Sequence, residues 1–447
     1  MPTISVEQNL IAKLLAQHKL DHDVEQIADE LPLLGTDIDR CDAQTLDIEI
    51  FPNRPDLLSG ETLTRAIRNF VHRQPAKPSI TTTEGKITLN VEPDLAEIRP
   101  VILGAVVRNV DYTSIGVSAD EFIKSLMDHQ EKLHFALGRG RKRASIGVHD
   151  LAKLAPPFTV KAVSGDTKFT PLAATEPMSI KEIMAEHPKG IEYAHLLSEF
   201  DRYPIILDAE NNVLSFPPII NGDHTTVTKE TKDFFIDVTG WDIRACESSL
   251  MLIALQLQEY GGIIETVEVT NCFGETNVYP NGSAVEHKLT IAAIQGLLGG
   301  KLTEEAISGA INRMGGKLVA CDDELITLEM PRWRFDILHP VDLVEDIAIG
   351  HGYEDLGHDI PRSPMTAKPR SDANLLRRVG NSMQGLGMMQ IQSLTLSNDD
   401  DQFNLVRWES VGEVTRITNP ITIDHTLLRQ YLLPGLLRLL STNRHHD

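Results

Sequence analysis

The sequence has few cysteines, and none of them are spaced as a metal-binding or disulfide pair. Cys41, Cys246, Cys272 and Cys321 are scattered and include no CxxC motif, which argues against a disulfide or zinc framework. The chain also lacks an apolar run long enough to cross a membrane, and its opening residues do not have the layout of a signal peptide. We therefore expect a soluble, cytoplasmic protein with reduced thiols.

Positive charge is also scarce. The chain carries 42 Lys and Arg against 64 Asp and Glu, a net charge of −22, which argues against a protein that coats nucleic acid by bulk electrostatics. Any RNA contact would have to come from a local basic patch or from a partner. The densest patch is residues 138–143, GRGRKR, and it is either a solvated loop or a contact for RNA phosphates.

Common catalytic signatures are missing as well. The sequence has no GxSxG motif, no Cys/His signature and no GxxxxGK[ST] phosphate loop. Residues 214–223, LSFPPIINGD, instead combine a predicted strand, a rigid Pro-Pro turn and small polar side chains. Loops at strand ends commonly build pockets, and they are as often held by their own hydrogen bonds without a ligand. The residues alone leave both interpretations open.

Acidic residues, by contrast, gather in the stretch WRFDILHPVDLVEDIAIGHGY. Asp342, Glu345 and Asp346 are spaced i, i+3, i+4 in a helix predicted to begin at Pro340, and Asp336 precedes it. One interpretation is a site for a hard cation such as Mg2+, which takes oxygen ligands. The other is the preference of acidic residues for the positive end of the helix dipole. Spacing alone favours the helix dipole.

The chain is too long for a single hydrophobic core, so we expect several domains. A linker rich in Pro, Ser and Thr at 75–85 and a linker with three prolines at 361–369 mark two boundaries. Helices followed by a β-hairpin around 303–330 indicate a small winged-helix-like module. The expected domains are an N-terminal α+β domain at 1–77 and further domains at 86–272, 275–359 and 370–447.

The runs LDIEIFPNRPDLLS and WRFDILHPVDLVEDIAIGHGYE closely resemble segments of the β subunit of phenylalanyl-tRNA synthetase, in its archaeal and eukaryotic cytosolic form. The resemblance extends through essentially the whole chain, in the family's domain order. It implies an α+β multidomain fold with an editing-type α/β domain at 86–272, a small winged-helix-like domain with an acidic metal site at 275–359, and an incomplete class II synthetase-like antiparallel sheet domain at 370–447.

In the last domain we expect a helix at 373–386 and strands at 389–396 and 413–418. The resemblance implies that this domain has lost its own chemistry, so a structural or subunit-contact role is expected for Arg429. Because the chain stops inside a motif that the family continues, we expect a C-terminally short form.

The resemblance also changes how the acidic stretch is interpreted. In the family, four acidic residues that match Asp336, Asp342, Glu345 and Asp346 are associated with Mg2+ near the contact with the α subunit. All four are present in this sequence. The resemblance therefore implies a Mg2+ site at the subunit junction.

Domain 86–272 is expected, again from the resemblance, to hydrolyse tyrosine that is wrongly attached to the phenylalanine tRNA. A pocket that hydrogen-bonds the tyrosine hydroxyl rejects phenylalanine strongly, because its buried polar groups would then stay unpaired. Ser215, Asn221 and Asp237 match positions of this pocket in the family, with Leu207 as an apolar wall. We expect Asp237 or Ser215 to recognise the phenol, and Asn221 to orient water or the ester.

The partners implied by the resemblance are an α subunit, in an α2β2 tetramer, and tRNA(Phe). ATP and phenylalanine would bind through the α subunit, where aminoacylation is expected, and no membrane is involved. A second hypothesis is a structural, tRNA-binding partner of the α subunit whose editing pocket is inactive. A third, a free-standing nucleic-acid-binding module at 275–359, is disfavoured by the net charge.

Overall fold

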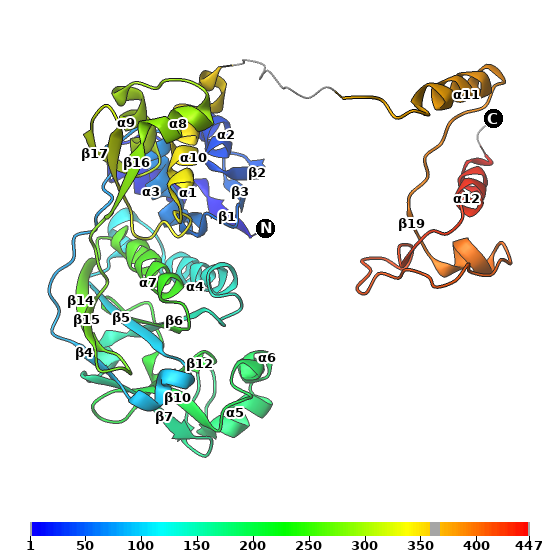
Figure 1. The fold of residues 1–447 in the computed structure, drawn as a ribbon. Helices are drawn as coiled ribbons and strands as arrows, with labels where there is room; N and C mark the ends of the chain where they lie inside the picture. Colours follow the sequence, from blue (N-terminus) through cyan, green and yellow to red (C-terminus); the bar gives the residue numbers. More distant parts are fainter. Residues whose placement is uncertain (1, 358–366, 446–447) are drawn as a thin grey trace. The chain divides into compact units, whose positions relative to one another are not determined.

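The computed structural model describes residues 2–357 and 367–445. The chain divides into two compact units, residues 1–359 and residues 360–447 (Figure 1). The first three expected domains thus belong to a single compact unit. Within the described ranges, no helix is long and apolar enough to cross a bilayer.

The N-terminal part of the first unit is a small three-stranded antiparallel sheet in the order β1-β3-β2. The alternating sequence TLDIEI forms β3, and its Leu46, Ile48 and Ile50 are fully buried while the residues between them are half-buried, as a period of two requires. Three helices accompany this sheet. The elements are β1 (Thr3–Glu7), α1 (Gln8–Ala16), α2 (Val24–Glu30), β2 (Thr36–Cys41), β3 (Thr45–Ile50) and α3 (Gly60–Phe70).

A ten-stranded sheet forms the centre of the first unit, in the order β12-β11-β10-β7-β4-β14-β5-β13-β6, with β15 paired to β14. Only the pairs that β4 makes with β7 and β14 are parallel. The strands are β4 (Thr88–Val91), β5 (Val101–Arg108), β6 (Ala144–Asp150), β7 (Phe158–Ser164), β10 (Arg202–Leu207), β11 (Val213–Phe216), β12 (Ile220–Asn221), β13 (Phe234–Gly240), β14 (Ile263–Thr270) and β15 (Thr276–Tyr279).

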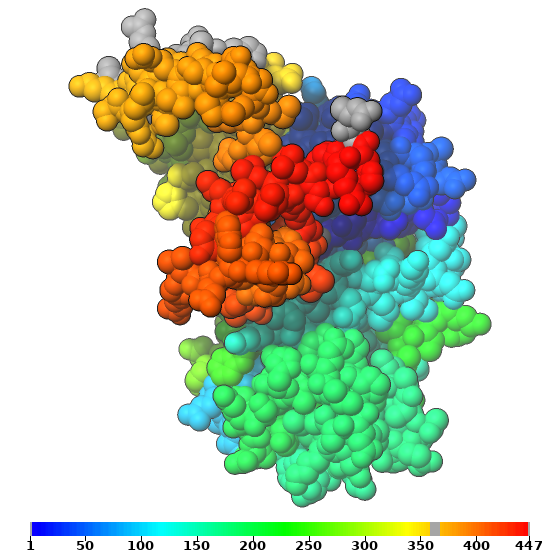
Figure 2. Space-filling view, turned by 90° about the vertical axis from the view of Figure 1, so that its right-hand side faces the viewer, coloured from blue at the N-terminus to red at the C-terminus, as the bar shows by residue number. Residues whose placement is uncertain are grey.

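Two long helices, α4 (Ala119–Ala136) and α7 (Ile243–Gln258), lie side by side over β5, β6 and β13 (Figure 1). Every residue of β6 and β13 is buried, so polar side chains on these strands must find partners inside the protein. The other end of the sheet carries β8 (Lys168–Phe169), β9 (Met178–Ser179), α5 (Ile180–Glu186) and α6 (Pro188–Tyr193), and forms the rounded green lobe at the bottom of Figure 2.

The last part of the first unit contains the expected helices and hairpin. Its sheet has the order β16-β18-β17, and α9 and α10 pack together beside it around the buried side chains of Ile307, Ile311, Leu328 and Ile347. The elements are β16 (Val285–Thr290), α8 (Ile291–Leu298), α9 (Glu304–Arg313), β17 (Lys317–Cys321), β18 (Leu325–Met330) and α10 (Pro340–His351).

The second unit differs from what we expected. Its first helix forms as α11 (Ala373–Gly385), and α12 (Leu433–Asn443) follows near the end. The strands expected at 389–396 and 413–418 are wrong: in residues 367–445 the structure has only β19 (Leu396–Ser397) paired with β20 (Leu427–Leu428) and an isolated bridge. Strands need neighbours to pair with, and the expected antiparallel sheet is not built there.

Candidate functional site

Ser215 and Asn221, predicted as pocket residues, face each other across a short hairpin. Ser215 on β11 is in register with Asn221 on β12, and its Oγ donates a hydrogen bond to Asn221 Oδ1 at 3.2 Å. Ser215 is only 3% exposed, whereas Asn221 is half-buried. The two strands are joined through Pro217 and Pro218, so a rigid turn fixes the hairpin.

Asp237 lies on β13 and is paired with a histidine that nothing in the sequence singles out. Nε2 of His149 lies 2.7 Å from Asp237 Oδ2, and Nδ1 lies 2.8 Å from Thr225 Oγ1. All three side chains are at most 2% exposed. A lone histidine in a strand gives no spacing signal in the sequence. The only hint is that a polar residue occurs in a strand that is buried throughout.

Gly147 makes room for this pair. It is directly opposite Asp237 in the β6–β13 register, on the same face as His149 because side chains alternate along a strand. A Cβ at position 147 would lie 2.0 Å from Asp237 Oδ2 and 2.7 Å from His149 Nε2. The sequence GVH in β6 thus provides both the imidazole of His149 and the space for the carboxylate of Asp237.

Hydrogen bonds connect the buried pair to the hairpin. Thr225 Oγ1 also lies 3.0 Å from the Gly222 carbonyl oxygen, and the Gly222 amide donates to the Leu214 carbonyl at 2.8 Å. The path runs from Asp237 through the imidazole and Thr225 to the residue after Asn221. The structure therefore joins the three predicted pocket residues through an intermediate chain of contacts, with Leu207 buried nearby on β10.

Two titratable groups, Arg99 and His224, lie close to this path. Burial lowers the pKa of Arg99 to about 10, although Asp237 acts in the opposite direction. The Arg99 guanidinium donates to Thr239 Oγ1 and to the Thr239 carbonyl, both at 2.7 Å. Burial also lowers the pKa of His224, a shift to which the neighbouring His149 adds, so His224 favours its neutral form. The surroundings of Asp237 thus include a buried cation.

The basic cluster at 138–143 is partly structural. Arg141 is buried and donates to the Ile219 carbonyl at 2.9 Å, and its guanidinium lies 4.3 Å from the Tyr193 ring centroid. Arg143 forms an ion pair with Asp242. The other two cations of the cluster are exposed. Because Arg141 fixes the hairpin turn, the cluster is neither a purely solvated loop nor a purely phosphate-binding one.

The four acidic residues predicted to bind Mg2+ do not converge. Asp336 accepts from Arg334 at 2.8 and 2.6 Å, and Asp346 Oδ1 accepts from the same guanidinium at 2.8 Å. Asp342 caps its own helix by accepting backbone amides at 2.7 and 2.6 Å, and Glu345 is exposed. Across residues 2–357 and 367–445, no three His, Cys, Asp or Glu side chains are placed to bind a metal.

These acids do not form a preorganised metal site in this structure, because Arg334 binds two of them; the Mg2+ site stays a prediction. A guanidinium fork neutralises two carboxylates that the sequence places on either side of a turn. Burial acts against ionisation of Asp336, but Arg334 keeps the pKa of that carboxyl below its usual value. Burial raises the pKa of Asp346 against the effect of Arg334, and Asp346 Oδ2 is buried without a hydrogen-bond partner.

Comparison with protein families finds three models that together match most of the chain. The B3/4 domain matches residues 103–256, the tRNA synthetase B5 domain matches residues 287–353, and the phenylalanyl tRNA synthetase beta chain CLM domain matches residues 357–447. They fall, in this order, on the ten-stranded sheet with its helices, on the β16–β18 module, and on the second unit.

Individual relatives agree with the family models. The phenylalanine–tRNA ligase beta subunit of Methanosarcina acetivorans is 41% identical over 447 residues, covering 100% of this chain and 80% of the relative. That of Archaeoglobus fulgidus is 36% identical, also over 100% of this chain. Among solved structures, an N-terminal fragment of the phenylalanyl-tRNA synthetase beta subunit from Pyrococcus horikoshii superposes with a TM-score of 0.72 at 29% identity, covering 79% of this chain and 100% of the fragment.

Proposed function

The chain belongs to the β-subunit family of phenylalanine–tRNA ligase, and from that premise we propose that its ten-stranded sheet carries an editing site that hydrolyses Tyr-tRNA(Phe). The observation that carries the proposal is the chain of contacts from Asp237 through His149 and Thr225 to the Ser215–Asn221 hairpin. A polar path of this length inside a sheet is costly, because each buried polar group must stay paired. A catalytic role explains why the chain has it.

Ser215 is the group that recognises the tyrosine hydroxyl. Its proton is donated to Asn221, so the lone pairs of Oγ remain to accept the O–H of a tyrosyl ring. A phenylalanyl ring would leave them unpaired, which is the kind of difference that gives strong discrimination. Asp237 is already paired with His149 and therefore acts as a positioning residue.

The hydrolysis itself uses water and the half-buried amide of Asn221. Water adds to the ester carbonyl, the bond to the terminal ribose oxygen breaks, and tyrosine and tRNA with a free hydroxyl are the products. Asn221 orients the water or the ester, and the Asp237–His149–Thr225 path holds the backbone after Asn221 in place. Arg334 binds Asp336 and Asp346, and Asp342 caps its own helix, so the proposed steps use only side chains and water.

The partner is an α subunit, in an α2β2 assembly in which ATP and phenylalanine bind the α subunit. The second unit supports this, because four apolar side chains of α11 are between 42% and 60% exposed: Leu375, Leu376, Val379 and Met383. Exposed apolar patches of this kind mark interaction surfaces. Leu376→Glu with Met383→Glu should abolish co-purification with the α subunit, whereas Asn381→Glu on the opposite face of α11 should not.

The editing proposal is tested with the assembled enzyme. Purified complex should release tyrosine from Tyr-tRNA(Phe) far faster than water does and leave Phe-tRNA(Phe) largely intact, and Ser215→Ala should reduce this preference. Release at the water rate would refute the proposal and favour the alternative, a structural and tRNA-binding partner with an inactive pocket. The near-complete burial of Ser215 and Asp237 is the observation that favours this alternative.

A further inference from the structure

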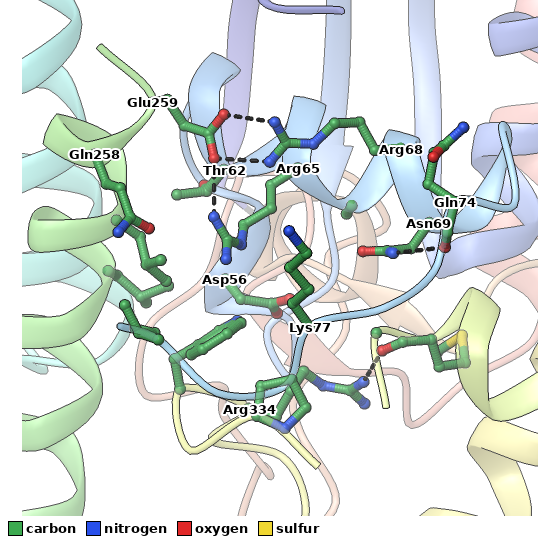
Figure 3. Close-up of a pocket in the computed structure, with 18 of the residues that line it drawn as sticks. Asp56, Thr62, Arg65, Arg68, Asn69, Gln74, Lys77, Gln258, Glu259 and Arg334 are labelled. Atoms are coloured by element: carbon green, nitrogen blue, oxygen red, sulfur yellow. Dashed lines mark hydrogen bonds and ion pairs between the residues drawn. The ribbon is translucent and has the colours of Figure 1, made fainter. Parts of the chain in front are cut away.

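A second polar site lies in a cleft of the first unit, away from the hairpin that carries Ser215. The cleft has a volume of about 630 Å3 and is lined by α3 and the segment that follows it, by the end of α7, and by the turns before α10 (Figure 3). It shares no lining residue with the candidate editing site. Its volume is within the range of small-molecule sites, roughly 300–1,000 Å3.

The lining of this cleft has the opposite charge balance to the chain as a whole. Six cations line it against two carboxylates, Asp56 and Glu259, in a protein with 42 basic and 64 acidic residues. Three of the cations have carboxylate partners of their own. Arg54 pairs with Asp56, Arg313 with Glu30, and Arg334 with Asp336 and Asp346.

The remaining three cations, Arg65, Arg68 and Lys77, have only one carboxylate among them, and it binds the two arginines. Glu259 at the end of α7 accepts from Arg65 at 3.0 Å and from both terminal nitrogens of Arg68 at 2.8 Å. Lys77 is exposed and makes no ion pair or side-chain hydrogen bond within the described ranges, and its side chain extends into the cleft (Figure 3). Together, Arg65, Arg68, Lys77 and Glu259 therefore carry two positive charges that no protein group neutralises.

Neighbouring groups do not remove the excess. Burial lowers the pKa of His18, and Arg68 lowers it further, so the imidazole beside Arg68 favours its neutral form. Burial also lowers the pKa of Arg65 in spite of Glu259, the direction expected where a cation has lost water without full compensation. An anion bound in the cleft would compensate the charge of Arg65.

One wall of the cleft is apolar and flat. Leu252 and Leu255 are fully buried in α7, and the Arg65 guanidinium lies 5.4 Å from the centroid of the Trp333 ring. We propose that this cleft binds a small phosphorylated molecule, with its phosphate between Arg65, Arg68 and Lys77 and its remainder against Trp333. A phosphate dianion matches two uncompensated charges, and guanidinium groups bind phosphate oxygens in pairs.

The proposal is tested on the full 447-residue chain without the α subunit, so that nucleotide sites of a partner do not interfere. Inorganic phosphate, AMP and a short single-stranded RNA are titrated by calorimetry, with phosphorus NMR as a second readout. Saturable binding of phosphate and tighter binding of AMP are expected. Lys77→Gln should weaken both by about tenfold or more, as the loss of one charge-assisted contact predicts.

Lys317→Gln is the matched control, because Lys317 is also exposed but lies on β17, outside the lining of the cleft. It should bind phosphate and AMP like the unchanged chain. Arg65→Lys keeps the charge but not the guanidinium fork, and should lose affinity for phosphate while the fold is retained. The proposal is overturned if phosphate and AMP do not bind saturably, if Lys77→Gln binds them unchanged, or if only the RNA binds.

Discussion

Nη2 of Arg334 lies 2.8 Å from Oδ1 of Asp346, and both side chains are at most 5% exposed. The same guanidinium also binds Asp336, so a single cation holds the segment before α10 to the helix itself. The acidic stretch is thus organised by an arginine two residues before its first carboxylate. Three groups that would be costly to bury alone neutralise one another in part.

Arg334→Met should therefore destabilise the first unit strongly. The substitution keeps much of the volume but leaves two carboxylates buried without their cation, which costs about 3–5 kcal/mol. Urea unfolding of the full chain, followed by tryptophan fluorescence, measures the loss. Arg40→Met, which removes an exposed ion pair with Asp42, is the control and should leave the unfolding midpoint unchanged; an equal loss in both variants would contradict the explanation.

Removal of Mg2+ should have little effect on the isolated chain. Asp342 is used as a helix cap and Glu345 is exposed, so the four acids do not form a preorganised metal site. Thermal unfolding in excess Mg2+ and in excess chelator should give the same midpoint within about one degree, because only a ligand that binds the folded state stabilises it. A large Mg2+-dependent rise that disappears in Asp346→Asn would instead support the predicted Mg2+ site.

Glu259 should make the first unit sensitive to acid. Burial acts against its ionisation, but Arg68 and Arg65 hold its pKa below the ordinary value of 4.5. A carboxyl with a depressed pKa in the folded state contributes stability that is present above 4.5 and is lost as the pH falls through the folded-state pKa.

Glu259→Gln should accordingly lower the free energy of unfolding near neutral pH and flatten its decline in acid. Urea titrations at about pH 7, 5 and 4 give the slope. Glu84→Gln, an exposed change in the linker, should keep the slope of the unchanged chain. A slope in Glu259→Gln as steep as that of the unchanged chain would mean that other carboxyls carry the acid response.

Sequence patterns predicted elements that depend on residue spacing along the chain. They failed where a side chain's partner is set by how the chain folds back on itself. The helices followed by a hairpin that were predicted around 303–330 form as α9, β17 and β18. The spacing of Asp342, Glu345 and Asp346 did place them near one another on a helix, but spacing gives no information about what packs against that helix. Here the opposing group is Arg334.

The same limit explains the two other differences. The strands expected at 389–396 and 413–418 have the right residue types, but of these residues only Leu396 and Arg416 pair, each with a residue of β20. Met389 and Leu394 remain 84% and 70% exposed. The role of His149 could not be predicted because its partners lie far along the chain. Asp237 reaches it through the pairing of β13 with β6, and Thr225 reaches it from the turn after β12.

Gly147→Ala should disrupt the buried pair without touching the surface. The new Cβ would lie 2.0 Å from Asp237 Oδ2, so the carboxylate must move away from His149, at a cost of about 1–3 kcal/mol for overpacking. Thermal unfolding and Tyr-tRNA(Phe) hydrolysis should both decline. Gly309→Ala in α9, where a Cβ meets nothing within 4 Å, should be neutral or slightly stabilising. Hydrolysis and stability unchanged in Gly147→Ala would contradict the close fit.

Asp237→Asn tests the positioning role most directly, because it is nearly isosteric and removes only the charge. An amide oxygen at this position still accepts from His149 Nε2, which lies 2.7 Å from the present Oδ2, so the fold should persist. The imidazole would, however, lose the anion that orients it, and the path to Thr225 and the hairpin would loosen. The catalysed rate of Tyr-tRNA(Phe) hydrolysis by the assembled enzyme should fall by about a hundredfold, within the range of effects seen for proton-positioning groups.

The measurement separates turnover from binding. In Asp237→Asn, kcat for deacylation should fall while KM for Tyr-tRNA(Phe) and the rate of phenylalanine attachment by the complex stay unchanged, because the tRNA contacts and the α subunit are untouched. Ser215→Ala should show the reverse pattern, with weakened selection of tyrosine over phenylalanine and a smaller loss of kcat. If both variants lose only stability, with kcat intact at temperatures where they are folded, Asp237 and Ser215 serve the fold alone and the editing site lies elsewhere.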